Sequence, residues 1–166
     1  MTRIIMSFAA LALFICFGAA GAQAQTAQDL VGTWTLVSAA IHSGSSGNVS
    51  LEPFGSDPSG TLIFGRDGHY ALIFLRRDLP KLTSNSRLSQ TVEESRDITK
   101  GSIAHFGTYA VDETGKFLVL RIESSTFPNW AGAEQRRPFS LSGDALTYIS
   151  PGSAGVATDI VLRRAK

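Results

Sequence analysis

Few side chains in this sequence are of types that could do chemistry, and they are widely spaced. His42, His69 and His105 lie on separate predicted strands and form no local ligand pattern such as His-x-His, so no metal site and no cofactor is predicted. His105 and Tyr109 are four residues apart on one predicted strand and therefore share a face. If that face points inward, they could polarise a carbonyl group in a cavity, which makes them the candidate catalytic residues.

The sequence lacks the common motifs of covalent and phosphate chemistry. It contains no Gly-x-Ser-x-Gly turn for a serine nucleophile, and the Gly-Ser-Ser-Gly at residues 44–47 has the wrong spacing. No glycine-rich loop with Lys and Ser or Thr is present for binding phosphates. A reaction in this protein would therefore depend on acid–base groups and on confinement of the substrate.

The first 24 residues have the features of a secretory signal peptide. Arg3 gives a basic start, and residues 4–17 form an apolar run that is too short and too weakly flanked for a membrane span. Ala22-Gln23-Ala24 fits the small-residue cleavage pattern. We expect cleavage after Ala24 and a mature domain over residues 25–166, periplasmic or secreted and without a stable membrane anchor. The alternative is a retained anchor.

Cleavage after Ala24 would change the composition of the chain. The sequence has 15 Lys and Arg and 14 Asp and Glu, and Arg3 is the only charged residue of the leader, which leaves 14 of each sign. A net charge near zero argues against nucleic acid or an anionic membrane surface as a partner. The single cysteine and both methionines also lie in the leader, which excludes disulfides and thiolate chemistry from the mature domain.

Short strand patterns joined by turn signals make up most of the remaining chain. Three pairs of apolar runs predict hairpins, namely 61–64 with 69–75, 104–111 with 116–123, and 136–141 with 145–149. Strands over 30–41 and 158–163 flank them, and the Ser/Gly-rich run 43–48 predicts a flexible loop. About eight strands joined mostly by short turns predict an all-β, antiparallel up-and-down barrel.

One segment breaks the strand pattern. Thr91-Val92-Glu93-Glu94 is a capping box, which predicts one short helix over residues 91–101. The segment is too polar for a buried helix. We therefore expect a surface helix that packs Leu88, Val92 and Ile103 over an open end of the barrel.

Alternation along the strands indicates which side chains face the interior. Leu118, Leu120 and Ile122 form a wholly apolar face. Gln135 and Arg137 share a face with apolar residues further along their strand, which is typical of a cup with a polar mouth. Alternatively, these two residues lie beyond the buried part of the strand. The residues predicted to line a cavity are Leu36, Phe64, Phe74, His105, Tyr109, Leu118, Leu120, Trp130, Phe139 and Tyr148.

Several segments, taken in order, resemble the bacterial and fungal lipocalin-like domain family within the wider calycin group. The opening segment is Leu-Val-Gly-Thr-Trp-Thr-Leu-Val-Ser at 30–38, and the closing segment is Val-Leu-Arg-Arg at 161–164. Segments 53–64, 107–109, 127–132 and 141–147 are similar to the blocks between them. The resemblance implies a barrel with an internal cavity and implies little about activity. Many members carry His where Leu120 and Arg121 stand here, and this departure weakens the case for a metal or a base at those positions.

The tryptophans of these segments have physical roles as well. In the Gly32-Thr33-Trp34 opening, Trp34 offers a flat face on which Arg163 or Arg164 can stack, a contact worth roughly 0.5–2 kcal/mol that would close one end of the barrel. Trp130 follows Pro128, which stiffens its loop. Trp130 is either anchored in the core or a gate at the mouth.

Three classes of function fit these observations. The first is an exported protein that binds a small apolar or amphipathic molecule in the barrel. The second is a cofactor-free enzyme of the cyclase or isomerase type, with His105 or Tyr109 as acid–base groups. The third is a protein-binding, inhibitor-like barrel that uses the loops over residues 43–59. A sizeable cavity would favour the first two classes, and a barrel filled by side chains would favour the third.

Overall fold

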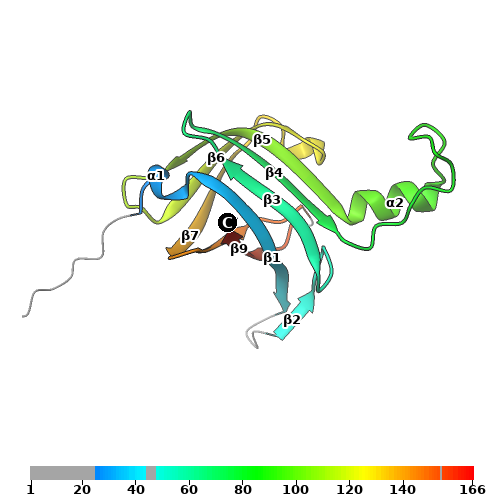
Figure 1. Cartoon of the computed structure of the whole chain (residues 1–166), viewed down its shortest axis with the longest axis horizontal. Helices are drawn as coiled ribbons and strands as arrows, with labels where there is room; N and C mark the ends of the chain where they lie inside the picture. Colours follow the sequence, from blue (N-terminus) through cyan, green and yellow to red (C-terminus); the bar gives the residue numbers. More distant parts are fainter. Residues whose placement is uncertain (1–24, 44–47, 154) are drawn as a thin grey trace, which may run out of the picture.

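The computed structural model describes residues 25–43, 48–153 and 155–166 of the chain. Eight of its strands form a closed antiparallel barrel (Figure 1). The predicted signal peptide and most of the predicted loop at 43–48 lie outside the described residues. The elements are α1 (Ala27–Leu30), β1 (Gly32–Ser43), β2 (Asn48–Leu51), β3 (Pro58–Phe64), β4 (His69–Arg76), α2 (Val92–Lys100), β5 (Ser102–Val111), β6 (Phe117–Ser125), the 3₁₀ helix η2 (Pro128–Trp130), β7 (Glu134–Ser142), β8 (Ala145–Ser150) and β9 (Thr158–Arg164).

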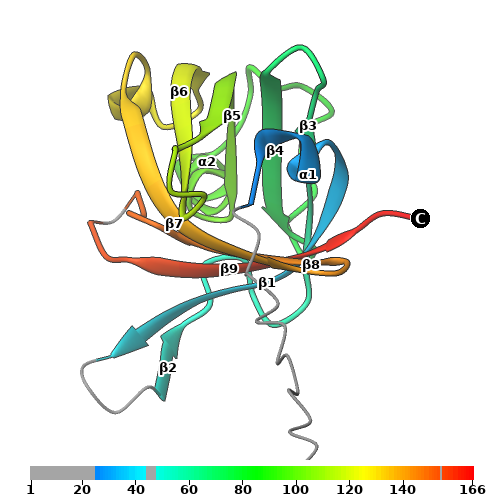
Figure 2. The same cartoon turned by 90° about the vertical axis from the view of Figure 1, so that its left-hand side faces the viewer.

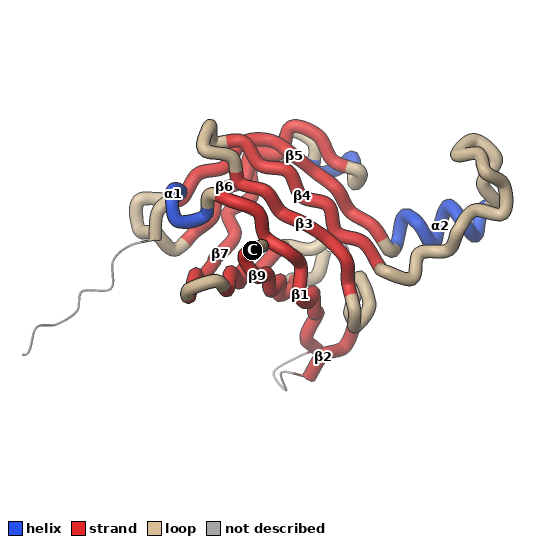
Figure 3. Tube along the Cα trace, in the orientation of Figure 1, coloured by secondary structure: helices blue, strands red, loops and turns tan. Residues whose placement is uncertain are grey.

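The strands follow one another around the barrel in chain order (Figure 3). From β3 to β9 each strand pairs antiparallel with the next, while β1 pairs with β3 on one edge and with β9 on the other. The closing register places Trp34 opposite Arg164 and Leu36 opposite Leu162. The predicted up-and-down barrel is thereby confirmed, with the three predicted hairpins as β3–β4, β5–β6 and β7–β8.

The short strand β2 is not among the strands predicted from the sequence. It pairs with the end of β1, where Ile41 lies opposite Leu51, beyond the part of β1 that pairs with β3. Four residues beside a Ser/Gly-rich run contain too little alternation to predict a strand. The hairpin of β1 and β2 extends past the rest of the barrel in Figure 2.

The two ends of the barrel interior are filled differently. At the end where β1 begins, side chains form a packed core in which the rings of Phe64 and Tyr109 lie 4.6 Å apart between centroids. Arg164 stacks on Trp34 at this end, whereas Arg163 is exposed. The opposite end holds the cavity described below. The fully buried core residues include Leu30, Trp34, Leu62, Phe64, Leu118, Leu120, Leu146 and Leu162.

The helix predicted over residues 91–101 is α2, but its position differs from the prediction. Its capping box is present, because the Thr91 hydroxyl accepts from the Glu94 N–H at 3.1 Å and Glu94 accepts from the Thr91 N–H at 2.9 Å. The helix projects away from the barrel (Figure 1), with Leu88 97% and Val92 69% exposed. The expectation that these two side chains cover the barrel end is therefore wrong. A capping box determines where a helix begins but not where the helix packs. Because α2 has no buried residue, no apolar face holds it against the barrel.

Candidate functional site

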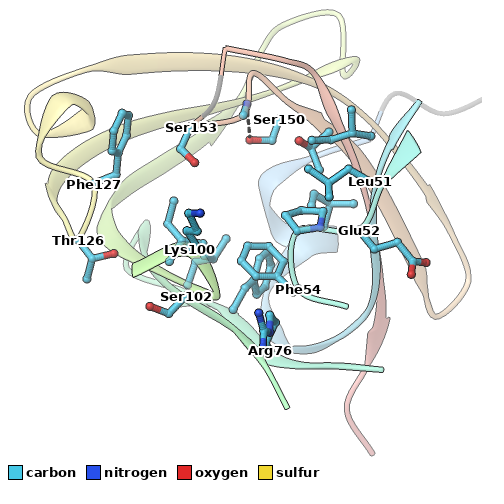
Figure 4. Close-up of a pocket in the computed structure, with 18 of the residues that line it drawn as sticks. Leu51, Glu52, Phe54, Arg76, Lys100, Ser102, Thr126, Phe127, Ser150 and Ser153 are labelled. Atoms are coloured by element: carbon cyan, nitrogen blue, oxygen red, sulfur yellow. Dashed lines mark hydrogen bonds between the residues drawn. The ribbon is translucent and has the colours of Figure 1, made fainter. Parts of the chain in front are cut away.

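The open end of the barrel leads into a cavity of about 920 Å³. Its rim is formed by the ends of several strands, by the end of α2 and by their loops. Figure 4 shows lining side chains around the cavity. Cavities of this size hold small organic molecules in other proteins. The rim residues include Leu51, Glu52, Arg76, Lys100, Thr126 and Ser153.

The wall of the cavity is largely apolar. Phe54, in the loop after β2, packs edge-on against Phe74 of β4 with 6.0 Å between ring centroids, and both side chains are buried. Leu72 of β4 and Ile160 of β9 continue the wall. Such a wall stabilises the apolar part of a ligand by roughly 25 cal/mol per Å² of buried area, before the cost of association.

A charged side chain is buried among these walls. Arg137, on the inward face of β7, is 1% exposed and lines the cavity. Its Nε and Nη2 both donate to Gln135 Oε1, at 3.1 and 2.7 Å. Burial lowers the pKa of the Arg137 guanidinium, which nevertheless stays protonated at neutral pH. The inward polar face of β7 is thus inside the barrel and does not lie beyond the buried part of the strand.

Aromatic rings flank the Arg137 guanidinium. Its Cζ lies 5.2 Å from the ring centroid of Tyr148 on β8 and 5.8 Å from that of Trp130 in η2. Burial raises the pKa of Tyr148 to about 12, against the opposing effect of the Arg137 charge. The Tyr148 hydroxyl is buried and makes no hydrogen bond of normal geometry with another described residue. Trp130 and Tyr148 thus both belong to the cavity wall and lie beside the Arg137 charge.

His105 lines the cavity as a neutral imidazole. Its Nδ1 is hydrogen-bonded to the Tyr70 hydroxyl of β4 at 2.8 Å, and its ring packs edge-on against Trp130 at 5.7 Å between centroids. Burial, with the Arg137 charge adding to it, lowers the pKa of His105 to about 3. Burial also raises the pKa of Tyr70. At neutral pH, Arg137 is therefore the charged member of this inner polar group.

The candidate catalytic pair is not brought together. Tyr109 lies in the packed end of the barrel, where its hydroxyl donates to the Gly65 carbonyl at 2.9 Å. Tyr109 is absent from the cavity wall, whereas His105 is part of it. The polar partner that His105 meets is Tyr70, on the neighbouring strand.

The other residues predicted to line a cavity divide in the same way. Phe74, Trp130 and Tyr148 are in the cavity wall. The remaining predicted residues belong to the packed core or its edge. Alternation predicts which side chains face the interior, but it does not predict at which end of the barrel they lie. Which residues contact a ligand stays a prediction. Those outside the cavity wall are Leu36, Phe64, Leu118, Leu120 and Phe139.

Leu72 and Phe54 are among the cavity residues that the sequence did not identify. Leu72 has an inward parity in β4, and counting from Phe74 would have found it. Phe54 lies in a turn-rich loop, where no periodic pattern indicates burial. Within the part of the chain that the structure describes, no group of three or more His, Cys, Asp or Glu is placed to hold a metal ion. Over the same part, no helix is long and apolar enough to cross a membrane.

These features define a class of protein: a closed antiparallel barrel, packed at one end, with a cavity at the other. A family model described as a lipocalin-like domain matches residues 31–157, which is most of the chain. The chain belongs to this family, as the resemblance of its segments implies. A comparison with curated proteins finds no match to the sequence.

Proposed function

We propose that this protein is exported and binds a small amphipathic molecule in the cavity of its barrel. The observation that carries the proposal is the contrast within one interior. One end is packed with large apolar side chains, and the other end holds about 920 Å³ between largely apolar walls. A barrel selected only for stability would fill that volume, because unfilled core volume lowers the free energy of unfolding.

The cavity also bears on the two alternative functions. A side-chain-filled barrel was the expectation for an inhibitor-like protein, so the cavity favours a small-molecule function. An enzyme of the cyclase or isomerase type needs an acid–base group with a pKa near the working pH. With its pKa lowered to about 3, His105 is a weak base, and Tyr109 lies outside the cavity wall. Binding without chemistry is therefore the better supported function.

Binding is tested with a neutral, environment-sensitive dye. Nile red added to the chain over residues 25–166 should become fluorescent with a micromolar Kd. Phe74→Arg places a charged side chain in the cavity wall and should abolish this signal. Ile73→Arg is the matched control, because the adjacent side chain on β4 points outward and is 46% exposed.

Two further measurements keep the binding test decisive. Thermal unfolding shows whether Phe74→Arg is folded, and Ser153→Trp at the exposed rim offers a second way to obstruct the cavity without a buried charge. Loss of dye binding in both cavity variants, with binding kept in Ile73→Arg, supports the proposal. If Nile red does not bind to the unmodified protein, the proposed small-molecule binding is refuted, and the protein-binding function becomes the better supported alternative.

Export is tested separately. Expression in a bacterial host with fractionation should place the protein outside the cytoplasm, and N-terminal sequencing of the exported form should begin at Gln25. A product that retains residues 1–24 would refute this part of the proposal.

A further inference from the structure

The charge of Arg137 has no counter-ion among the described residues inside the barrel. The side chain is 1% exposed, and its two hydrogen bonds of normal geometry to described residues both go to one neutral acceptor, Gln135 Oε1. Among the described residues, no carboxylate lies within ion-pair distance of it. Buried charges are normally paired, since an unpaired one loses its hydration without compensation. Its position therefore calls for a partner that enters the cavity.

The acidic residues of the cavity cannot supply that partner. Glu52 and Asp78 both belong to its lining, but both are exposed at the rim. Asp78 is already paired there with Arg76, at 3.0 Å between Oδ1 and Nε. The negative groups are thus at the mouth, in water, while the positive group is inside.

The guanidinium also retains hydrogen-bonding capacity. An arginine has five N–H donors, and the two bonds to Gln135 occupy one on Nε and one on Nη2. Nη1 makes no hydrogen bond of normal geometry to a described residue. The buried Tyr148 hydroxyl interacts with the guanidinium and makes no hydrogen bond of normal geometry with a described residue. The guanidinium thus keeps N–H donors for a ligand in the cavity, with the Tyr148 hydroxyl beside them.

The charge balance limits the ligand to one negative charge. His105 is neutral, so Arg137 is the only charged group among the buried residues of the described cavity lining. A dianion such as a phosphate monoester would bring a second negative charge into an apolar enclosure without compensation. A carboxylate brings one charge and a planar pair of oxygens that match the guanidinium fork.

We propose that Arg137 binds the carboxylate of an amphipathic monocarboxylic acid, whose apolar body extends along Phe54 and Phe74 toward the mouth. The inference rests on the proposed small-molecule function and gives its ligand a chemical class and an orientation. Trp130 and Tyr148 flank the head group, and the apolar wall holds the remainder. The charge supplies discrimination against neutral analogues, and the wall supplies most of the affinity.

The test compares two probes that share one apolar body. Sodium dodecanoate and 1-dodecanol, both below the concentrations at which they aggregate, compete with Nile red for the chain over residues 25–166. Dodecanoate should bind at least tenfold more tightly than dodecanol. In Arg137→Met this ratio should fall to about one through loss of dodecanoate affinity, while dodecanol and dye affinities change less than threefold. Arg137→Met keeps the length and apolar volume of the side chain, which favours a folded variant.

Arg136→Met is the matched control. Arg136 precedes Arg137 on β7, points outward, and pairs with Asp112 at 3.0 Å. Its replacement removes the same charge from the opposite face and should leave the dodecanoate-to-dodecanol ratio within threefold of its original value. A drop in both variants would show a general effect of net charge and overturn the inference.

The outcomes separate this inference from the function on which it rests. If dodecanol and Nile red bind but dodecanoate binds no better than dodecanol, the carboxylate inference fails and the binding function stands. If the ratio persists in Arg137→Met, Arg137 is not the recognition group. If neither probe nor dye binds, both proposals fail.

Discussion

The guanidinium of Arg164, near the C-terminus, lies 4.2 Å from the ring centroid of Trp34, near the start of the barrel. The same side chain donates from Nη1 to the Val31 carbonyl at 2.8 Å and from Nη2 to the Asp29 carbonyl at 2.7 Å. Trp34 Nε1 donates to the Leu30 carbonyl at 2.8 Å. Three successive carbonyls at the end of α1 are thus satisfied by two stacked side chains, which joins the first helix to the last strand and closes the packed end of the barrel.

Arg164→Ala should lower the free energy of unfolding by about 1–3 kcal/mol, because it removes the stack on Trp34 and leaves two backbone carbonyls without a protein donor. The matched control is Arg163→Ala. That side chain is exposed, and its loss should change stability by less than about 0.5 kcal/mol. Urea unfolding of both variants measures the difference, and equal effects would remove the special role given to Arg164.

Gly32→Ala should also be destabilising, by roughly 1–3 kcal/mol. Gly32 has φ +131°, and a Cβ there would lie 3.1 Å from Arg164 Nη1. Gly55→Ala separates the two causes, because Gly55 has φ +73° with nothing within 4 Å of an added Cβ. Chemical denaturation should show a larger loss of unfolding free energy for Gly32→Ala than for Gly55→Ala. In the Gly32→Ala/Arg164→Ala double variant, part of the loss caused by Gly32→Ala should disappear. Equal costs at the two glycines would mean that crowding of Arg164 has no part in the effect.

The strand arrangement was predictable because it depends on local signals. Alternation of apolar residues and short turns with glycine located the three hairpins, and the ordered segments from the Gly-x-Trp opening to the closing arginines indicated the family. The capping box located α2 for the same reason. The direction in which α2 projects depends on docking contacts, which no local pattern contains.

The cavity was harder to predict because it depends on how far along the barrel each side chain lies and on the register between paired strands. Leu120 and Tyr148 both face inward, yet only Tyr148 is in the cavity wall. The contact between Tyr70 and His105 joins two strands whose register is fixed by the assembled sheet. Arg137 was identified as inward-facing, but arginines are rarely fully buried, so a position at the mouth was the better expectation from sequence.

His105 should make the stability of the protein sensitive to mild acid. Its pKa is about 3 in the folded protein, against 6.5 for an unperturbed histidine. Between these values the unfolded chain binds a proton that the folded protein does not, so stability falls as the pH falls from about 6.5 toward 3, by up to about 1.4 kcal/mol per pH unit. His105→Gln keeps an acceptor for Tyr70 and lacks this titration.

Urea unfolding at pH 7, 6 and 5 measures this effect as the difference between the unmodified protein and His105→Gln. The difference should shift in favour of His105→Gln as the pH is lowered, while contributions from carboxylates cancel between the two proteins. NMR titration of His105 provides an independent check. A parallel pH dependence of the two proteins, or an imidazole that protonates near pH 6.5, would contradict the buried, neutral state of His105.

Arg137 and Gln135 should destabilise the ligand-free protein. A guanidinium without a counter-ion loses hydration that two bonds to one amide oxygen do not replace, and well-packed apolar residues in place of buried ionic groups are often stabilising by about 1–4 kcal/mol. Gln135→Leu/Arg137→Met removes the charge together with its acceptor and should therefore raise the free energy of unfolding. Arg137→Met alone should gain less, because it leaves Gln135 Oε1 buried without a donor. Urea unfolding of the ligand-free proteins, with Arg136→Met as the outward-facing control, measures the gain. A double variant less stable than the unmodified protein would show that Arg137 serves the packing of the barrel itself, and that its burial is not explained by a ligand.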